Sequence, residues 1–275
     1  MNQPPPPSPN LGITDREFAL FQAMVHQETG ITLSGQKKAL LVGRLGARLR
    51  HRQTPSFSEY HELLRHPGEK DELQAAIDLI TTNETSFFRE PGHFKALAEY
   101  VRDLRPVPLP FRAWSAASSS GEEAYTLAMV LSDLLGGAEW QVLGTDISTR
   151  VLERARRAVY PMERAKAIPA DFLRRYCLKG HGPHEGMFLM DRRIRDRVAF
   201  SQANLCQPLP RLGPFDVAFL RNVLIYFDLP EKRKVIKHVI SQMKPGGLLI
   251  VGHSESLTNF SEGLSVVRPT VYRVD

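Results

Sequence analysis

The chain has 275 residues, and its 42% hydrophobic content is enough to build a large core with room for two domains. Its formal net charge of +6 favours an acidic partner of some kind. There is no apolar run long enough to cross a bilayer, no secretory leader, and only Cys177 and Cys206, without metal-ligand spacing. We therefore expect a cytoplasmic protein without membrane insertion and without a zinc site.

Residues 1–13 form a proline-rich tail in which we expect no packed structure. Helical patterns begin directly after it. Thr14 and Glu17 have the spacing of a capping box, which predicts a helix start. Three further amphipathic patterns follow, so residues 14–80 are predicted to be an all-helical N-terminal domain.

The second predicted helix is basic, with Lys37, Arg44 and Arg48 along it. A Lys/Arg face of this kind is often only a solvated surface. The alternative is a docking face for an acidic partner. A protein helix fits that role better than nucleic acid, because no aromatic residues are interleaved for base stacking.

Residues 81–92 are polar at both ends and aromatic in the middle. They can be a simple linker, or they can form a roof over a ligand site built by the next segment. In the second case Arg89 is the cation placed over the site. Pro91 then begins another helix.

The stretch from Phe111 to Met129 predicts a buried strand, a loop of small residues and a helix. In doubly wound sheets a loop of this kind binds nucleotides with its free backbone N–H groups. This loop has Gly121 but lacks the G-x-G-x-x-G spacing, and Glu122 and Glu123 at the helix start disfavour a phosphate. The pattern favours a ligand that carries a positive charge.

A second strand, residues 140–144, ends just before Asp146. An acid at this place, after the first loop, can accept hydrogen bonds from a ribose diol. Asp146 can also be only a turn or capping residue. Behind a loop such as 118–123, we favour the ribose role.

Residues 160–197 interrupt the strand–helix alternation and predict an inserted subdomain with small antiparallel strands. The loop of this insert contains His181 and His184, but two histidines without Cys or Asp companions are a weak metal signal. We expect no metal ion there.

The sheet then resumes with predicted strands at 198–201, 215–220 and 248–256, and with residues 270–274 as an edge strand. Residues 244–247 (KPGG) are predicted to be a turn. His253 is expected to be a buried structural histidine at the end of the fifth strand, outside the catalytic set.

Six segments together resemble the bacterial chemotaxis receptor methyltransferases of the CheR-type family. The resemblance runs from Thr14 to the end of the chain. Ser118 and Ala124 depart from the usual residue types without removing a polar contact. The segments are TTNETSFFRE (81–90), WSAASSSGEEAYTLAM (114–129), GTDIS (144–148), FDVAFLRNVLIYFD (215–228), KPGGLLIVGHSES (244–256) and TVYRV (270–274).

The resemblance implies an α/β fold: a Rossmann-like S-adenosylmethionine-dependent methyltransferase domain over residues 93–275, with a small antiparallel β-subdomain, after the all-helical domain. It also implies that residues 81–92 contribute to the cofactor site. Glu123 would meet the amino acid end of the cofactor and Asp146 its ribose, while Arg89 and Tyr226 would lie nearest the methyl group. The implied cofactor-binding residues are Asn83, Thr85, Arg89, Glu123, Asp146, Asn204, Leu205, Leu220 and Arg221, the last four on the adenine side.

The implied function is transfer of a methyl group to glutamate side chains of chemotaxis receptors, giving methyl esters and S-adenosylhomocysteine for sensory adaptation. Lys37, Arg44 and Arg48 would face the acidic methylation helices. The loop 180–186 would suit a receptor C-terminal peptide. The expected protein is a monomer recruited to receptor arrays.

Three points stay open at this stage. Tyr226 can instead be an aromatic residue packed behind the fourth strand. The chain can also be a cofactor-binding sensor or scaffold, although Arg89 and Asp146 are both present. A nucleic-acid-binding protein is a third reading that rests on charge alone.

Overall fold

The computed structural model describes residues 12–104, 106–257, 260 and 262–275. Most of the proline-rich tail therefore lies outside the described residues. The chain divides into two compact units, Met1–Thr82 and Asn83–Asp275. Within the described ranges, no helix is both long enough and apolar enough to cross a membrane.

The first unit is all-helical. The capping box is confirmed: the Thr14 hydroxyl accepts a hydrogen bond from Glu17 N, and the Glu17 carboxylate accepts one from Thr14 N. Phe21, Leu45 and Tyr60 lie in a shared core. The helices are α1 (Asp15–Thr29), the 3-10 turn η1 (Gly35–Lys37), α2 (Lys38–His51), α3 (Phe57–Arg65) and α4 (Lys70–Ile80).

The basic side chains of α2 are partly used inside this unit. Arg44 Nη1 donates to the carbonyl oxygens of Ile80, at 2.6 Å, and of Thr81, at 3.1 Å. Arg48 forms a two-pronged ion pair with Glu72 of α4. Burial alone would raise the pKa of Glu72, but hydrogen bonds from Arg48, Tyr60 and Arg52 lower it to about 2. Arg44 and Arg48 therefore tie α2 to α4.

The second unit is built on a seven-stranded sheet with the order β6-β2-β1-β7-β8-β10-β9. The first five strands in this order run parallel, and β10 and β9 are antiparallel additions. All six residues of β7 are buried, as expected for a central parallel strand. The strands are β1 (Phe111–Ser115), β2 (Trp140–Asp146), β6 (Val198–Gln202), β7 (Phe215–Leu220), β8 (Met243–Val251), β9 (Leu264–Arg268) and β10 (Val271–Val274).

Two details of the predicted sheet are wrong. The last strand, β10, is not at the edge, because β9 pairs with its outer side. Residues 244–247 are not a terminal turn but lie inside β8. There Gly246 has φ +76° and the pairing with β7 shifts register, so the residues form a bulge that a glycine accommodates.

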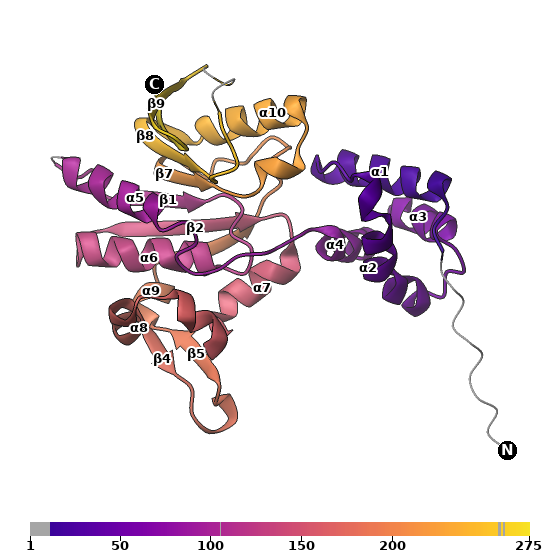
Figure 1. Ribbon diagram of the computed structural model, residues 1–275, viewed down its shortest axis with the longest axis horizontal. Helices are drawn as coiled ribbons and strands as arrows, with labels where there is room; N and C mark the ends of the chain where they lie inside the picture. Colours follow the sequence, from indigo (N-terminus) through magenta and orange to yellow (C-terminus); the bar gives the residue numbers. More distant parts are fainter. Residues whose placement is uncertain (1–11, 105, 258–259, 261) are drawn as a thin grey trace. The chain divides into compact units, whose positions relative to one another are not determined.

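Helices cover both faces of the sheet (Figure 1). Helices α6 (Glu122–Leu135) and α7 (Thr149–Arg157) connect β1 to β2 and β2 to β6, moving outward in one direction. Helix α10 (Leu229–Ile240) connects β7 to β8 in the other direction, so right-handed crossovers place it on the opposite face. Helix α5 (Gly92–Asp103) packs beside α6. This is the doubly wound arrangement that the sequence predicted.

The insert between α7 and β6 is confirmed as a small antiparallel subdomain. Its three strands have the order β3-β5-β4. Phe188 of β5 and Tyr160 of β3 pack against the ring of Phe87, with ring centroids 5.8 and 5.0 Å away. Its elements are β3 (Val159–Pro161), η2 (Met162–Ala167), α8 (Ala170–Tyr176), β4 (Cys177–Lys179), η3 (Gly182–His184), β5 (Met187–Met190) and α9 (Arg192–Arg195).

Candidate functional site

The candidate site lies at the carboxyl ends of the parallel strands, where the strand order reverses between β1 and β7. This is the position at which open α/β sheets bind small ligands. The loop 116–121 follows β1, Asp146 ends β2, and the stretches 203–205 and 221–222 follow β6 and β7. All of these residues belong to the second unit.

The loop after β1 requires glycine at one position. Gly121 has φ +96° and is the N-cap of α6. A Cβ atom there would lie 2.9 Å from Ala155 Cβ and 3.0 Å from the Tyr160 hydroxyl oxygen. The left-handed conformation and the close approach both exclude a side chain. The loop therefore turns tightly against α7 and the insert before α6 begins.

Asp146 is buried between two loops. Its Oδ2 accepts a hydrogen bond from Ser119 N and its Oδ1 accepts one from Ser148 N, both at 2.9 Å. The carboxylate, and not the Ser148 side chain, caps the start of α7. A local turn role for Asp146 is therefore present. An ionised carboxylate only accepts hydrogen bonds, which is the property that a ribose diol requires of its partner.

The two acids at the start of α6 face different partners. Glu122 is fully buried and pairs with Arg164 of the insert at 2.7 Å. Glu123 accepts hydrogen bonds from the Ser115 hydroxyl at 2.7 Å and from Arg221 Nη1 at 2.8 Å. Burial raises the pKa of both carboxyl groups, and the neighbouring arginines oppose that effect.

Arg221 joins three parts of the site. Its side chain is 1% exposed, and Nη1 contacts Glu123. Nη2 donates to the Arg89 carbonyl oxygen at 2.7 Å and lies 3.0 Å from Glu90 Oε2. The guanidinium group is thus committed to Glu123 and to the segment before α5. An adenine contact at this position would have to come from the backbone or from Leu220.

The segment 83–90 is held over the loop and the start of α6. The Ser119 hydroxyl donates to the Asn83 carbonyl oxygen at 2.8 Å, and Arg164 donates to that of Thr85 at 2.9 Å. Further along, Phe88 N donates to the Thr126 hydroxyl at 3.2 Å. These contacts are typical of a segment that covers the site, and they do not fit a free linker.

Arg89 is half-buried within this roof and has an unusual backbone on both sides. Phe88 has φ +50° and Glu90 has φ +54°. Each left-handed non-glycine residue costs roughly 1–2 kcal/mol, which surrounding contacts must offset. Here the Phe88 ring packs 5.2 Å from that of Phe172, and Arg221 holds the Arg89 carbonyl. The backbone of Arg89 is therefore fixed.

Tyr226 lies half-buried at the end of the short helix η4 (Leu224–Tyr226), which follows β7. Glu255, which is 4% exposed, holds this turn in place, and the sequence analysis missed it. In the sequence, only the position of Glu255 within the GHSES segment could have marked it as a functional residue. The Glu255 carboxylate accepts hydrogen bonds from Asn222 N (2.7 Å), Gly252 N (2.8 Å) and Ile225 N (3.3 Å).

The other expected binding residues lie on the same edge of the sheet. Asn204 accepts a hydrogen bond from Cys206 N at 3.0 Å, which closes a turn after β6. Leu205 and Leu220 are buried at the ends of their segments. The structure thus brings all nine expected cofactor-binding positions and Tyr226 into the second unit.

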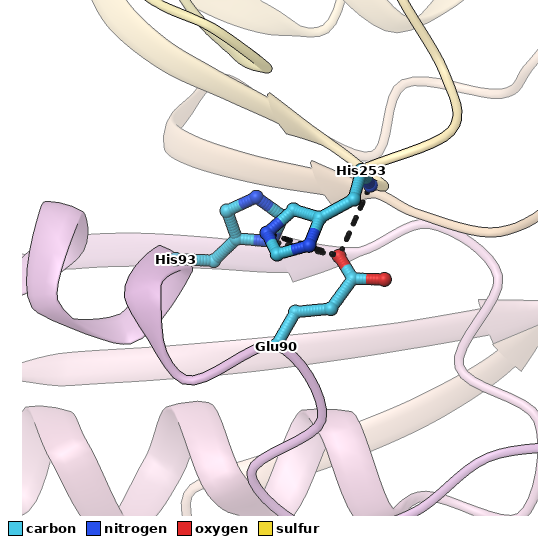
Figure 2. A group of neighbouring side chains, drawn as sticks. All are labelled: Glu90, His93 and His253. Atoms are coloured by element: carbon cyan, nitrogen blue, oxygen red, sulfur yellow. Dashed lines mark hydrogen bonds and ion pairs between the residues drawn. The ribbon is translucent and has the colours of Figure 1, made fainter.

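His253 is not buried, so that prediction is wrong. Its side chain is 63% exposed, because β8 ends at Val251 and the following turn directs residue 253 outward. It lies beside two residues that the sequence analysis did not select, Glu90 and His93 (Figure 2). Burial lowers the pKa of His93 to about 4, so its imidazole is neutral at pH 7.

The chemistry of this edge suits one kind of ligand. Glu123 can hold a cationic group, and Asp146 can accept from a diol. A carboxylate pair at the start of α6 opposes a phosphate, which the positive end of a helix would otherwise attract. The residues therefore fit a nucleoside that carries a positive charge and no phosphate.

Comparisons with known proteins agree with this geometry. Residues 16–81 match the family described as CheR methyltransferase, all-alpha domain, and residues 83–273 match CheR methyltransferase, SAM binding domain. A chemotaxis protein methyltransferase of Salmonella typhimurium is 38% identical over 265 residues, covering 95% of this chain and 91% of the relative. Chemotaxis protein methyltransferase 2 of Pseudomonas aeruginosa is 38% identical over 275 residues, covering 97% of each.

Proposed function

This chain belongs to the CheR methyltransferase family, and we propose that it methylates glutamate side chains of chemotaxis receptors. The family membership makes it an S-adenosylmethionine-dependent methyltransferase of chemotaxis. The methyl ester product and its use in sensory adaptation are the proposal. The observation that supports them best is Arg89, a cation fixed by its backbone beside the cofactor edge of the sheet.

S-adenosylmethionine fits the residues present. It is a nucleoside with a sulfonium cation, an amino acid end that carries an ammonium group, and no phosphate, and when bound it supplies an activated methyl group. We propose that Glu123 holds the ammonium group and Asp146 the ribose. Asn83, Thr85 and Arg89 would contact it from the roof, and Asn204, Leu205, Leu220 and Arg221 from the adenine side.

A glutamate acceptor needs little chemical help. Its pKa is about 4.3, so the carboxylate is already an anionic nucleophile at neutral pH and needs no general base. The enzyme must instead orient it, and orientation can contribute about 7–11 kcal/mol. We propose that Arg89 holds the carboxylate by a charge-assisted hydrogen bond and that the Tyr226 hydroxyl completes its alignment.

For the receptor, we propose that α2 docks on the acidic methylation helices. Arg44 and Arg48 are anchored to α4, where Glu72 offsets the charge of Arg48, and Lys37 is the residue just before α2. These side chains would meet the acidic helices as a group. The loop 180–186 of the insert would take a receptor C-terminal peptide. Docking in this way would recruit a monomer to the receptor arrays.

Single-turnover kinetics test the roles of Arg89 and Tyr226. Arg89→Ala should lose most methyl transfer to receptor membranes while its affinity for S-adenosylmethionine falls less. Tyr226→Phe should lose less transfer than Arg89→Ala, because one hydroxyl is removed and the ring stays. Glu153→Ala, on the exposed face of α7, is the matched control. Equal losses of binding and transfer in both variants would contradict the assigned roles.

A further inference from the structure

Glu90, His93 and His253 converge from two distant segments of the chain (Figure 2). One ligand-type atom from each lies within 4.8 Å of those of the other two. His93 Nδ1 is 3.3 Å from Glu90 Oε2, and His253 Nε2 is 3.9 Å from the same oxygen. His93 is buried, Glu90 is partly buried, and His253 is open to solvent.

One ring nitrogen of His93 has a hydrogen-bonding partner, and the other has none within the described part of the chain. The Thr270 hydroxyl donates to the Pro269 carbonyl oxygen at 2.6 Å, so its oxygen is free to accept. His93 Nε2 lies 2.9 Å from this oxygen, within hydrogen-bond distance. With the proton on Nε2, the hydroxyl oxygen accepts that bond and Nδ1 keeps a lone pair for a metal ion.

His93 Nδ1 lies close to a carboxylate. His93 is 3% exposed, and its Nδ1 makes no hydrogen bond within the described part of the chain. Nδ1 is 3.3 Å from Glu90 Oε2 but forms no hydrogen bond with it. A buried ring nitrogen without a partner is unfavourable, and a metal ion held by Nδ1 and the carboxylate would satisfy it.

We propose that Glu90, His93 and His253 bind a divalent transition metal ion, with Zn²⁺ as the best match. Two imidazoles and one carboxylate are a known zinc donor set that leaves a fourth position open. Ligand atoms around tetrahedral zinc are about 3.3–3.5 Å apart, given metal–ligand distances of about 2.0–2.2 Å. The His93–Glu90 separation already matches, and the exposed His253 side chain needs only a small movement.

A neighbouring hydroxyl group can orient one of the proposed ligands. A metal-ligating histidine commonly donates its other N–H to a neighbouring oxygen, which fixes the ring, and Thr270 does this for His93. Two groups already contact the oxygen that the metal would use: Arg221 Nη2 lies 3.0 Å from Glu90 Oε2, and His253 N donates to it at 3.2 Å. Binding must therefore draw the Glu90 carboxylate away from Arg221, which limits the affinity.

This competition gives the site a consequence for activity. Arg221 also holds the Arg89 carbonyl oxygen and Glu123. Glu90 directly follows Arg89 in the chain, so drawing its side chain away from Arg221 is expected to shift the backbone at Arg89. Zn²⁺ is therefore expected to inhibit methyl transfer reversibly. This consequence rests on the proposed function, whereas the binding itself does not.

The test is direct metal binding to the full-length protein. Titration with Zn²⁺ by calorimetry, and with Co²⁺ by its visible absorption, should show one site. His253→Ala should weaken it by about tenfold or more, and Thr270→Val should weaken it by about tenfold while Thr270→Ser retains it. His181→Ala, in the insert loop, should bind as the wild type does.

Two outcomes would overturn the proposal: the wild type binds neither ion, or His253→Ala binds Zn²⁺ as tightly as the wild type does. Circular dichroism of the variants separates loss of the site from loss of the fold. Inhibition is measured separately, as methyl transfer in the presence of Zn²⁺ and after chelation. Inhibition that His253→Ala does not relieve would overturn the link to Arg221 even where binding is seen.

Discussion

Glu255 offers the most direct way to test whether the turn that carries Tyr226 is held by one buried carboxylate. Glu255→Ala removes the acceptor for Asn222 N and Gly252 N, which lie 2.7 and 2.8 Å from a single carboxylate oxygen. Hydrogen bonds to a charged group contribute about 1.5–3 kcal/mol each. The lower value for both bonds gives about 3 kcal/mol, and the longer Ile225 contact is not counted.

A loss of about 3 kcal/mol is a large part of a typical unfolding free energy of about 5–15 kcal/mol. Urea unfolding should show it as a lower midpoint with an unchanged slope. Glu255→Gln keeps one acceptor oxygen and should lose roughly half as much. Under conditions where both variants are folded, turnover should fall more than affinity for S-adenosylmethionine, because the turn positions Tyr226.

Glu153→Ala is the control, since Glu153 is exposed on α7. If Glu255→Ala unfolds at the same urea concentration as this control, the carboxylate does not hold the turn. If Glu255→Ala unfolds at a lower urea concentration than the control but has normal turnover when folded, then the position of Tyr226 does not depend on this turn. Either result would refute the reasoning.

Three further predictions concern other parts of the chain. The pKa of Glu72 is lowered to about 2, so its contribution to stability is fully present above its unfolded pKa of about 4.5 and is lost as the pH falls toward 2. In Glu72→Gln, the free energy of unfolding should therefore depend less on pH over that range. Gly121→Ala places a Cβ atom 2.9 Å from Ala155 Cβ at a position with a left-handed backbone. It should lower the free energy of unfolding by at least about 1 kcal/mol and weaken cofactor binding, as measured by calorimetry. Binding and stability equal to those of the wild type would contradict the tight turn. Asp146→Asn should weaken S-adenosylmethionine binding by about tenfold, the effect of one charge-assisted hydrogen bond; unchanged affinity would remove the ribose role.

The parts of the fold that depend on local pattern could be predicted from the sequence. The Thr14–Glu17 capping box and the buried run 215–220 carry their structural signal within a few residues. The outer strand β9 was not predicted, because its exposed residues 265–267 show no alternation. The bulge at Gly246 was read as a turn because both need the same glycine conformation.

The candidate site could be predicted only where a residue stands at the end of a strand or at the start of the helix that follows one. Asp146 and Glu123 were found in this way. Glu255 was missed because its role depends on backbone N–H groups in another segment, which no spacing rule reveals. Arg221 was expected on the adenine side, but its guanidinium group contacts Glu123. Sequence spacing does not reveal that contact either.

The histidines show most clearly what the spacing of residues in the sequence cannot reveal. His181 and His184 are close in the sequence and drew attention as weak metal candidates. His93 and His253 are far apart in the sequence, and only the fold brings their rings to 4.8 Å between centroids. His253 was expected to be buried because its neighbours in β8 are, but the turn after Val251 reverses that pattern.

The measurement that tests the central claim most directly is transfer of labelled methyl from S-adenosylmethionine to receptor-bearing membranes, followed by mild alkali. Carboxyl methyl esters hydrolyse under these conditions, so the account predicts that the label is released as volatile methanol. Label that stays on the receptor would place the methyl group on nitrogen or carbon and would contradict a glutamate acceptor.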